Sequence, residues 1–347
     1  MDLSALEPID FHCHGCGPFD FAKPHEVQLD EIEMTLTKDR IFAVLTLFVP
    51  HGRFIAFEDL CRTYGRKRRC GELKRILGIA SEGPLLASAG GTPEKGSWLP
   101  TKVEWQRFAA LGEHGFRYSV LSPDFDLTTS SGSQYPKGME WIVDALLSNG
   151  VSPALGHFLK TAPEHSAACA RRVFDRVEQL GQGLALTDHL YNDMPLNFKH
   201  AWRTQRERES RAQDLVDAGL DAWSPENLDA ALGVVPATLI RAAWDGLAKI
   251  CLNFDGAHVD SLICKRTVEL VGAGNLMLMT DCITGDVLAG EQLTRSEENS
   301  LLYQRSGIVA GGSCPASKQV ENMIAMGLEP DEIAHICYEN AIGLLGS

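Results

Sequence analysis

Residues 8–14 of the chain read Pro-Ile-Asp-Phe-His-Cys-His, a short apolar segment that ends in two histidines. Side chains on a β-strand alternate between the two faces of the sheet, so the imidazoles of His12 and His14 point to the same side. At this spacing the two rings can share one metal ion. The segment therefore predicts a strand over Pro8–His12 whose C-terminal end carries metal ligands.

Seven further strand candidates follow, and helical patterns separate them. The eight apolar segments are Pro8–His12, Ile41–Phe48, Ile76–Ala80, Phe116–Leu121, Ser152–Gly156, Gly183–Thr187, Lys249–Asn253 and Leu276–Met279. The expected helices include Lys137–Asn149, Pro163–Leu180, Leu239–Leu247, Ser261–Val271, Pro315–Gly327 and Asp331–Leu345. Eight βα units predict a closed (β/α)8 barrel, the TIM barrel of the α/β class.

The length of the chain fits this architecture. Its 347 residues, 44% of them hydrophobic and 22% charged, can form one barrel of roughly 250 residues or more. We therefore expect a single domain over residues 1–347, with a charged helical insertion at about 200–235.

Charge and cysteine content restrict the partners and the location. The formal charge of −14 would repel a phosphate backbone, which argues against nucleic acid as a partner. A local basic run is interpreted as a solvated helix face: Arg62, Arg66, Lys67, Arg68 and Arg69. The longest apolar stretch, Ile41–Val49, is far shorter than the roughly 20 residues of a membrane helix, so no membrane span is predicted. Ten scattered cysteines and no charged-then-apolar leader predict a reduced, cytoplasmic protein.

Motifs of other protein classes are absent or incomplete. An open doubly wound sheet would need a G-x-G-x-x-G or a P-loop after its first strand, and neither is present. A serine hydrolase of the G-x-S-x-G type is not supported either. Cys13 and Cys16 form one C-x-x-C, which suggests a redox pair or half of a zinc ribbon. Because Cys13 alternates with two inward histidines, we expect it to pack behind the site instead.

Polar residues follow the strand candidates at their C-terminal ends, which form the active-site face of such barrels. Glu82, His157, His189 and Asp281 each come shortly after one of the predicted strands. A single histidine at such a place is more often a satisfied polar residue than a ligand, but the set together favours a metal site. These donors suit Zn²⁺, Fe²⁺ or Mn²⁺, and a carboxylate such as Glu82 can bridge two ions.

Seven segments around these residues form an ordered set of motifs. They are Ile9–Gly15 (IDFHCHG), Ser81–Pro84 (SEGP), Val120–Asp124 (VLSPD), Gly156–His157 (GH), Asp188–Pro195 (DHLYNDMP), Phe254–Val259 (FDGAHV) and Met279–Asp281 (MTD). In the same order they resemble the motifs H-x-H-G, L-E-G-P, L-A-P-E, A-G-H, T-H-L-Y-N-A-M-P, A-D-G-x-H-V and V-T-D of N-acetylglucosamine-6-phosphate deacetylases, a branch of the amidohydrolase superfamily. The similarity runs nearly from end to end of the chain.

The resemblance implies a metal-dependent amidohydrolase with one or two divalent ions. Glu82, His157 and His189 would hold the principal ion. His12 and His14 would complete a second site or support the first. Zn²⁺ is the expected metal, with Fe²⁺ or Mn²⁺ as alternatives.

The resemblance also implies the roles of three further residues. Asp281 would be the catalytic residue that acts first as base and then as acid. Asn192 and His258 would bind the substrate, although a helix cap for Asn192 and a supporting hydrogen bond for His258 are the alternative interpretations. The implied activity is deacetylation of a small N-acetyl amino sugar such as N-acetylglucosamine-6-phosphate. Another N-acyl or cyclic amide substrate, or a non-catalytic barrel that binds a sugar or a partner protein, stays open.

Three departures from the family pattern concern the substrate. The β-sandwich that usually flanks the barrel is expected to be missing. The loop Leu85–Gly96 contains no histidine where the family has one that contacts substrate. The family's G-R-E sequence is also missing, and its place is taken by a charged segment with His200, Arg203, Arg206, Arg208 and Arg211. That segment is a lid, a homo-oligomer contact that restores phosphate binding, or an exposed helix.

Overall fold

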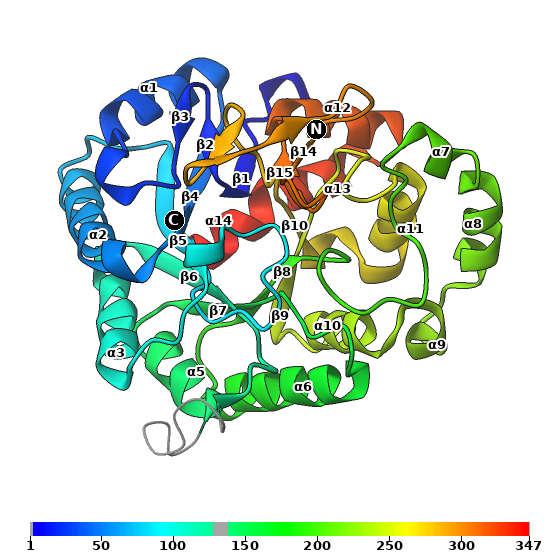
Figure 1. The fold of residues 1–347 in the computed structure, drawn as a ribbon, viewed down its shortest axis with the longest axis horizontal. Helices are drawn as coiled ribbons and strands as arrows, with labels where there is room; N and C mark the ends of the chain where they lie inside the picture. Colours follow the sequence, from blue (N-terminus) through cyan, green and yellow to red (C-terminus); the bar gives the residue numbers. More distant parts are fainter. Residues whose placement is uncertain (1–2, 128–137, 347) are drawn as a thin grey trace.

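The computed structural model describes residues 3–127 and 138–346, and eight parallel strands form its central barrel (Figure 1). The strands are β1 (Ile9–Cys13), β4 (Phe42–Phe48), β5 (Ile76–Glu82), β6 (Phe116–Leu121), β7 (Ser152–Leu155), β8 (Ala185–His189), β9 (Ala248–Leu252) and β10 (Leu276–Leu278). Each strand pairs with the next one along the chain, and β1 and β10 also contact each other. The predicted (β/α)8 barrel is confirmed.

Helices surround the barrel on its outer side (Figure 1). They include α1 (Leu29–Asp39), α2 (Phe54–Arg69), α3 (Lys102–Ala110), α5 (Met139–Leu147), α6 (Pro163–Leu180), α10 (Val234–Trp244), α11 (Ser261–Val271), α12 (Ala316–Ala325), α13 (Pro330–Ala334) and α14 (Asn340–Leu345). The helix predicted from Lys137 begins at a position outside the described residues. Helix α10 starts five residues earlier than the predicted Leu239, because Pro236 lies in its first turn, where the missing N–H is not needed.

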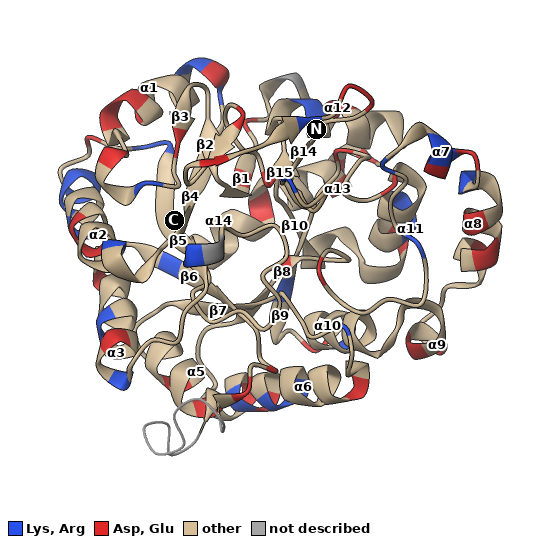
Figure 2. Ribbon diagram, in the orientation of Figure 1, with Lys and Arg blue, Asp and Glu red and all other residues tan. Residues whose placement is uncertain are grey.

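The charged residues lie mainly on this outer layer. Figure 2 shows both signs of charge along α2, α3 and α6. The basic run at the end of α2 is largely exposed, as predicted, and Lys67 pairs with Asp30 and Glu72. Within the described residues, no helix is both long and apolar enough to cross a membrane.

The segment expected as a charged helical insertion folds into three short helices: α7 (Gln205–Arg208), α8 (Arg211–Ala218) and α9 (Leu228–Leu232). They lie beside α11 at the right of Figure 1. Arg211 forms a two-pronged ion pair with Asp260, which caps the start of α11. The first part of the insertion is thereby attached to the barrel wall.

Short antiparallel strands follow β10 and were not predicted. These are β11 (Val287–Leu288) with β12 (Glu291–Gln292), and β13 (Thr294–Arg295) with β14 (Leu301–Tyr303) and β15 (Val309–Gly312). Strands of two to four residues are too short for an alternating pattern to be recognised. Outside the barrel, the described part of the chain has sheets of two or three strands only, and none of them is a two-layer sandwich.

The interior of the barrel is filled by apolar side chains below the polar strand ends. The ring of Tyr118 stacks on Phe11 at a centroid distance of 5.4 Å and lies 6.1 Å from His12. Its hydroxyl donates to the carbonyl of Phe11 and hydrogen-bonds with Thr46. The C-terminal helix α14 packs against the other end of this core through Ala341. Tyr118 therefore supports the strand that carries His12.

A second set of contacts closes the barrel between its first and last strands. Asp10 of β1 is buried and accepts hydrogen bonds from the amide and the hydroxyl of Thr280, at 3.1 and 2.6 Å. The carbonyl of His12 accepts from the amide of Asp281 at 3.0 Å. These bonds place Asp281 next to the histidines of β1.

We predict that Tyr118→Phe lowers the free energy of unfolding by about 1–3 kcal/mol, because it leaves the buried carbonyl of Phe11 and the Thr46 hydroxyl without their partner. Urea denaturation followed by circular dichroism measures this change. Tyr338→Phe is the control, because no hydrogen bond of the Tyr338 hydroxyl occurs in the described part of the chain. Equal stability of the two variants would contradict the assigned role.

Candidate metal centre

The C-terminal ends of four strands, β1, β5, β7 and β8, bring all five predicted ligands together. Glu82 at the end of β5 lies at the middle of this cluster. Its Oε2 is 3.2 Å from Nε2 of His12 and 2.8 Å from Nε2 of His14. Its Oε1 is 2.9 Å from Nε2 of His157, which follows β7. All these side chains are buried.

The cluster consists of two overlapping groups. Within each group, the candidate ligand atoms lie within 4.8 Å of one another. One group is His12, His14, Glu82 and Asp281, and the other is Glu82, His157, Asp188 and His189. Four such nitrogen and oxygen donors suit a divalent cation of the Zn²⁺, Fe²⁺ or Mn²⁺ type. Because Glu82 belongs to both groups, the donor set fits one ion in either group or one in each.

Asp188 is a member of this cluster that the sequence analysis did not select. Neighbouring residues of a regular strand point to opposite faces. The pairing of β8 with β9, however, is irregular between Leu186 and His189, and both Asp188 and His189 face the cluster. The acidic residue directly before His189 was the available signal.

Neighbouring groups orient the histidines. Nδ1 of His14 lies 3.1 Å from the carbonyl of Thr46 and donates a hydrogen bond to it, so Nε2 is the nitrogen that faces Glu82 in the centre. Nδ1 of His157 lies 2.9 Å from Asp193, whose other oxygen pairs with Lys160 at 2.7 Å. Asp193 occupies the position at which the family motif T-H-L-Y-N-A-M-P has alanine, so the motif predicted no role for it.

The carboxylates of the cluster raise the pKa values of its histidines. Burial alone would lower the pKa of His14, but Glu82 and Asp281 outweigh it and raise the pKa to about 10. Burial likewise opposes ionisation of Glu82, yet the surrounding histidines hold its pKa well below the usual range. A bound cation would replace these protons as the partner of the carboxylates.

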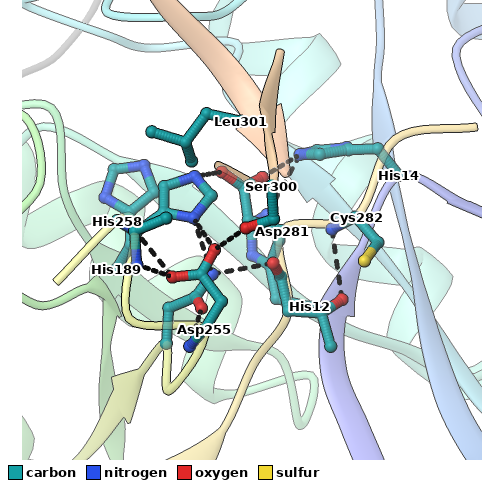
Figure 3. Close-up of polar contacts among 12 residues, drawn as sticks. His12, His14, His189, Asp255, His258, Asp281, Cys282, Ser300 and Leu301 are labelled. Atoms are coloured by element: carbon teal, nitrogen blue, oxygen red, sulfur yellow. Dashed lines mark hydrogen bonds and ion pairs between the residues drawn. The ribbon is translucent and has the colours of Figure 1, made fainter. Parts of the chain in front are cut away.

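Asp281 lies between two histidines, as Figure 3 shows. Its Oδ1 is 3.3 Å from Nε2 of His14, and its Oδ2 is 3.3 Å from Nε2 of His258. The other ring nitrogen of His258 lies 2.8 Å from Asp255, which also accepts from the hydroxyl of Ser300 at 3.1 Å. His258 therefore contacts Asp281, in line with a supporting role. It also lines the cavity described next, so a contact with substrate stays open.

A cavity of about 100 Å³ opens onto the cluster. Its lining includes His189, Asp281, Asn192, His258, Lys160 and Arg203. The side-chain nitrogen of Asn192 is buried and has no hydrogen-bond partner in the described residues. Asn192 and His258, the two predicted substrate-binding residues, thus line the same cavity as Asp281, the predicted general acid–base.

The loop without the family histidine packs over this centre. A Cβ at Gly90 would lie 2.7 Å from Oδ2 of Asp193 and 3.0 Å from Nδ1 of His157. Only a residue without a side chain leaves the hydrogen bond between them undisturbed. The loop therefore packs against His157, a predicted ligand, where the family pattern has a histidine that contacts substrate.

Several residues of the centre adopt left-handed backbone conformations. The φ angles are 54° for His157, 45° for Asp193 and 52° for Asp281. Such conformations are costly for residues other than glycine and gather at functional sites.

Comparisons with known proteins agree with the fold. No protein-family model matches the chain, and a search of curated proteins found no match. Among solved structures, the fold is that of N-acetylglucosamine-6-phosphate deacetylases. The structures from Mycobacterium smegmatis, Thermotoga maritima and Pasteurella multocida each superpose with a TM-score of 0.68, at 18, 16 and 17% identity.

These superpositions cover 98% of this chain and 77, 78 and 76% of the three deacetylase chains, in the same order. The M. smegmatis structure is that of a variant in complex with N-acetyl-D-glucosamine-6-phosphate. The resemblance noted in the sequence is confirmed at the level of the fold. The superpositions do not cover the rest of each deacetylase chain.

We predict that the purified protein carries divalent metal and that Glu82→Gln loses most of it, because Glu82 belongs to both groups. Metal analysis of protein passed over a desalting column measures the content, and circular dichroism checks the fold. Glu113→Gln removes an exposed carboxylate and is the control. Full metal content in Glu82→Gln would refute the assignment of the centre.

Proposed function

We propose that this chain is a metal-dependent hydrolase that cleaves an amide C–N bond and deacetylates an N-acetyl amino sugar of the N-acetylglucosamine-6-phosphate type. The observation that carries the proposal is the position of Asp281. It lies 3.3 Å from His14, within two overlapping groups of candidate ligands at the C-terminal face of the barrel. The deacetylase-like fold supports it.

The metal ligands in this proposal are His12, His14, Glu82, His157 and His189, and Zn²⁺ is the expected ion. A divalent ion held there lowers the pKa of water to near ~7 and polarises a carbonyl group. The protein's own residues then have to move one proton. The amine must leave protonated, because an amide anion is far too basic.

Asp281 is suited to that proton transfer. Burial raises the pKa of its carboxyl, but the neighbouring imidazoles of His14 and His258, each 3.3 Å away, hold the pKa below its usual range. The group is therefore ionised, which is the form that a general base must have before it takes a proton from water. His258, itself held by Asp255, keeps Oδ2 of Asp281 in place.

An arginine in the cavity lining supports the proposal that the substrate is anionic. Arg203 comes from the segment that replaces the family's G-R-E sequence, and its guanidinium has no ion pair within the described residues. Next to it, Nε2 of His200 is buried without a hydrogen-bond partner. Burial and the charge of Arg203 lower the pKa of His200 to about 3, so His200 is neutral and Arg203 supplies the positive charge. A substrate phosphate would pair with this guanidinium.

A second candidate substrate class is a smaller N-acyl or cyclic amide compound. The cavity measures only about 100 Å³, and the loop at Gly90 covers the centre without offering a polar side chain. Acetate release measured across N-acetylated sugars, sugar phosphates, amino acids and cyclic amides distinguishes the two classes. A non-catalytic barrel would release nothing from any of them.

The unpaired thiols support the expected location. All ten cysteines are free in the structure. Free thiols in this number are typical of a reducing compartment, which fits the cytoplasm. An oligomer contact through the segment of α7 and α8 stays a prediction.

We predict that Asp281→Asn lowers turnover by roughly 10² or more, the usual scale for the loss of a general acid–base, and leaves bound metal nearly unchanged. Steady-state kinetics and metal analysis on the same preparation measure both effects. Asp286→Asn, an exposed neighbour on the same segment, is the control. Turnover near the parent rate would refute the proton-transfer role, and loss of metal would make Asp281 chiefly a ligand.

We predict that Arg203→Gln raises KM for a phosphorylated substrate by about 10–100-fold, since a hydrogen bond to a charged group contributes about 1.5–3 kcal/mol. KM for the same sugar without phosphate should not change. The neighbouring Arg206→Gln, an exposed arginine, is the matched control. An equal effect on both substrates would show that Arg203 does not contact the phosphate.

A further inference from the structure

We infer that Asp188 is an additional metal ligand and that, with it, the centre holds two divalent ions at once. The inference rests on the proposed metal-dependent function and names a ligand that the family motif does not contain. In the family string the residue before the histidine is threonine, whereas this chain has aspartate.

The position of Asp188 connects the two ligand groups. Its Oδ1 lies 3.3 Å from Nδ1 of His12, a member of the first group. Its Oδ2 lies 3.2 Å from Nε2 of His189 and 3.4 Å from Nε2 of His157, both in the second group. One carboxylate thus faces ligands of both groups, as Glu82 does from β5.

The carboxylate of Asp188 is buried and accepts no hydrogen bond from the described residues. It is 2% exposed, and neither oxygen accepts a hydrogen bond of normal geometry from any described residue. A buried carboxylate in this state costs several kcal/mol unless a cation compensates it. Coordination to a cation would satisfy both oxygens at once.

The surrounding chain makes room for this side chain. A Cβ at residue 156 would lie 2.6 Å from Cβ and 2.9 Å from Oδ2 of Asp188, so only glycine fits there. The hydroxyl of Thr187 donates to the carbonyl of Asp188 at 2.8 Å and accepts from the amide of Cys251 at 3.0 Å. The backbone of Asp188 is thereby held between β8 and β9.

The charge of the centre favours two ions over one. Glu82, Asp188 and Asp281 bring three negative charges into a buried cluster, and Lys160 in the cavity lining is already paired with Asp193. A single divalent ion leaves a net negative charge, which would repel the negative charge that develops on a carbonyl oxygen under attack. Two divalent ions leave a net positive charge, which stabilises it.

The test compares parent protein, Asp188→Asn and Asp188→Thr, each stripped of metal and titrated with Mn²⁺. The control is Glu58→Gln, which removes a buried carboxylate on α2, away from the centre. We expect two Mn²⁺ ions per chain in the parent and in the control. In both Asp188 variants one of the two ions should bind at least ~100-fold more weakly, beyond the effect of a group that only supports a ligand.

Electron paramagnetic resonance of the parent gives a readout that needs no variant. Two ions that share the carboxylates of Glu82 and Asp188 should be exchange-coupled, and their spectrum should lose the six-line signal of isolated Mn²⁺. A six-line spectrum at saturation, or a stoichiometry of one ion in the parent, would overturn the inference. Two ions bound with parent affinity in the Asp188 variants would overturn it as well. Acetate release is assayed separately, so a protein that binds two ions and hydrolyses no amide would refute the proposed function alone.

Discussion

The buried carboxylate of Glu82 is the group on which the rest of the centre depends. Its two oxygens lie within 2.8–3.2 Å of Nε2 of His12, His14 and His157, which come from two different places on the barrel rim. A carboxylate withdrawn from water requires positive charge or donors around it. This requirement holds the ends of β1, β5 and β7 in one arrangement and joins both ligand groups into a single centre.

The barrel provides the rigidity that this arrangement needs. Parallel strands end at a common face, so short loops suffice to bring ligands together. The bonds from Thr280 to Asp10 close the sheet and set the position of Asp281 against β1. The left-handed conformations of His157 and Asp281 are tolerated because neighbouring contacts hold both residues. The short strands after β10 then complete the cavity, with Val309 in its wall.

Most of the fold and most members of the candidate site could be predicted from residue patterns, and the exceptions have a common cause. The strand ending in His12 and His14 could be recognised because alternation and a two-residue spacing are local properties. Asp188 escaped notice because regular alternation places it on the face opposite His189, and the irregular pairing of β8 with β9 changes that. Asp193 and Asp255 were missed because their partners, His157 and His258, become visible only when side-chain contacts are known.

Hydrophobic periodicity and residue type act over a few neighbours, so the residue order was enough to predict the eight barrel strands and the kinds of donor at their ends. Which oxygen faces which ring nitrogen depends on how distant segments pack. The tertiary structure also decided that Asp188 faces both ligand groups, that Gly156 leaves room for it, and that Arg203 enters the cavity wall. These features depend on strand register and on the packing of loops from distant parts of the chain, which no local pattern encodes.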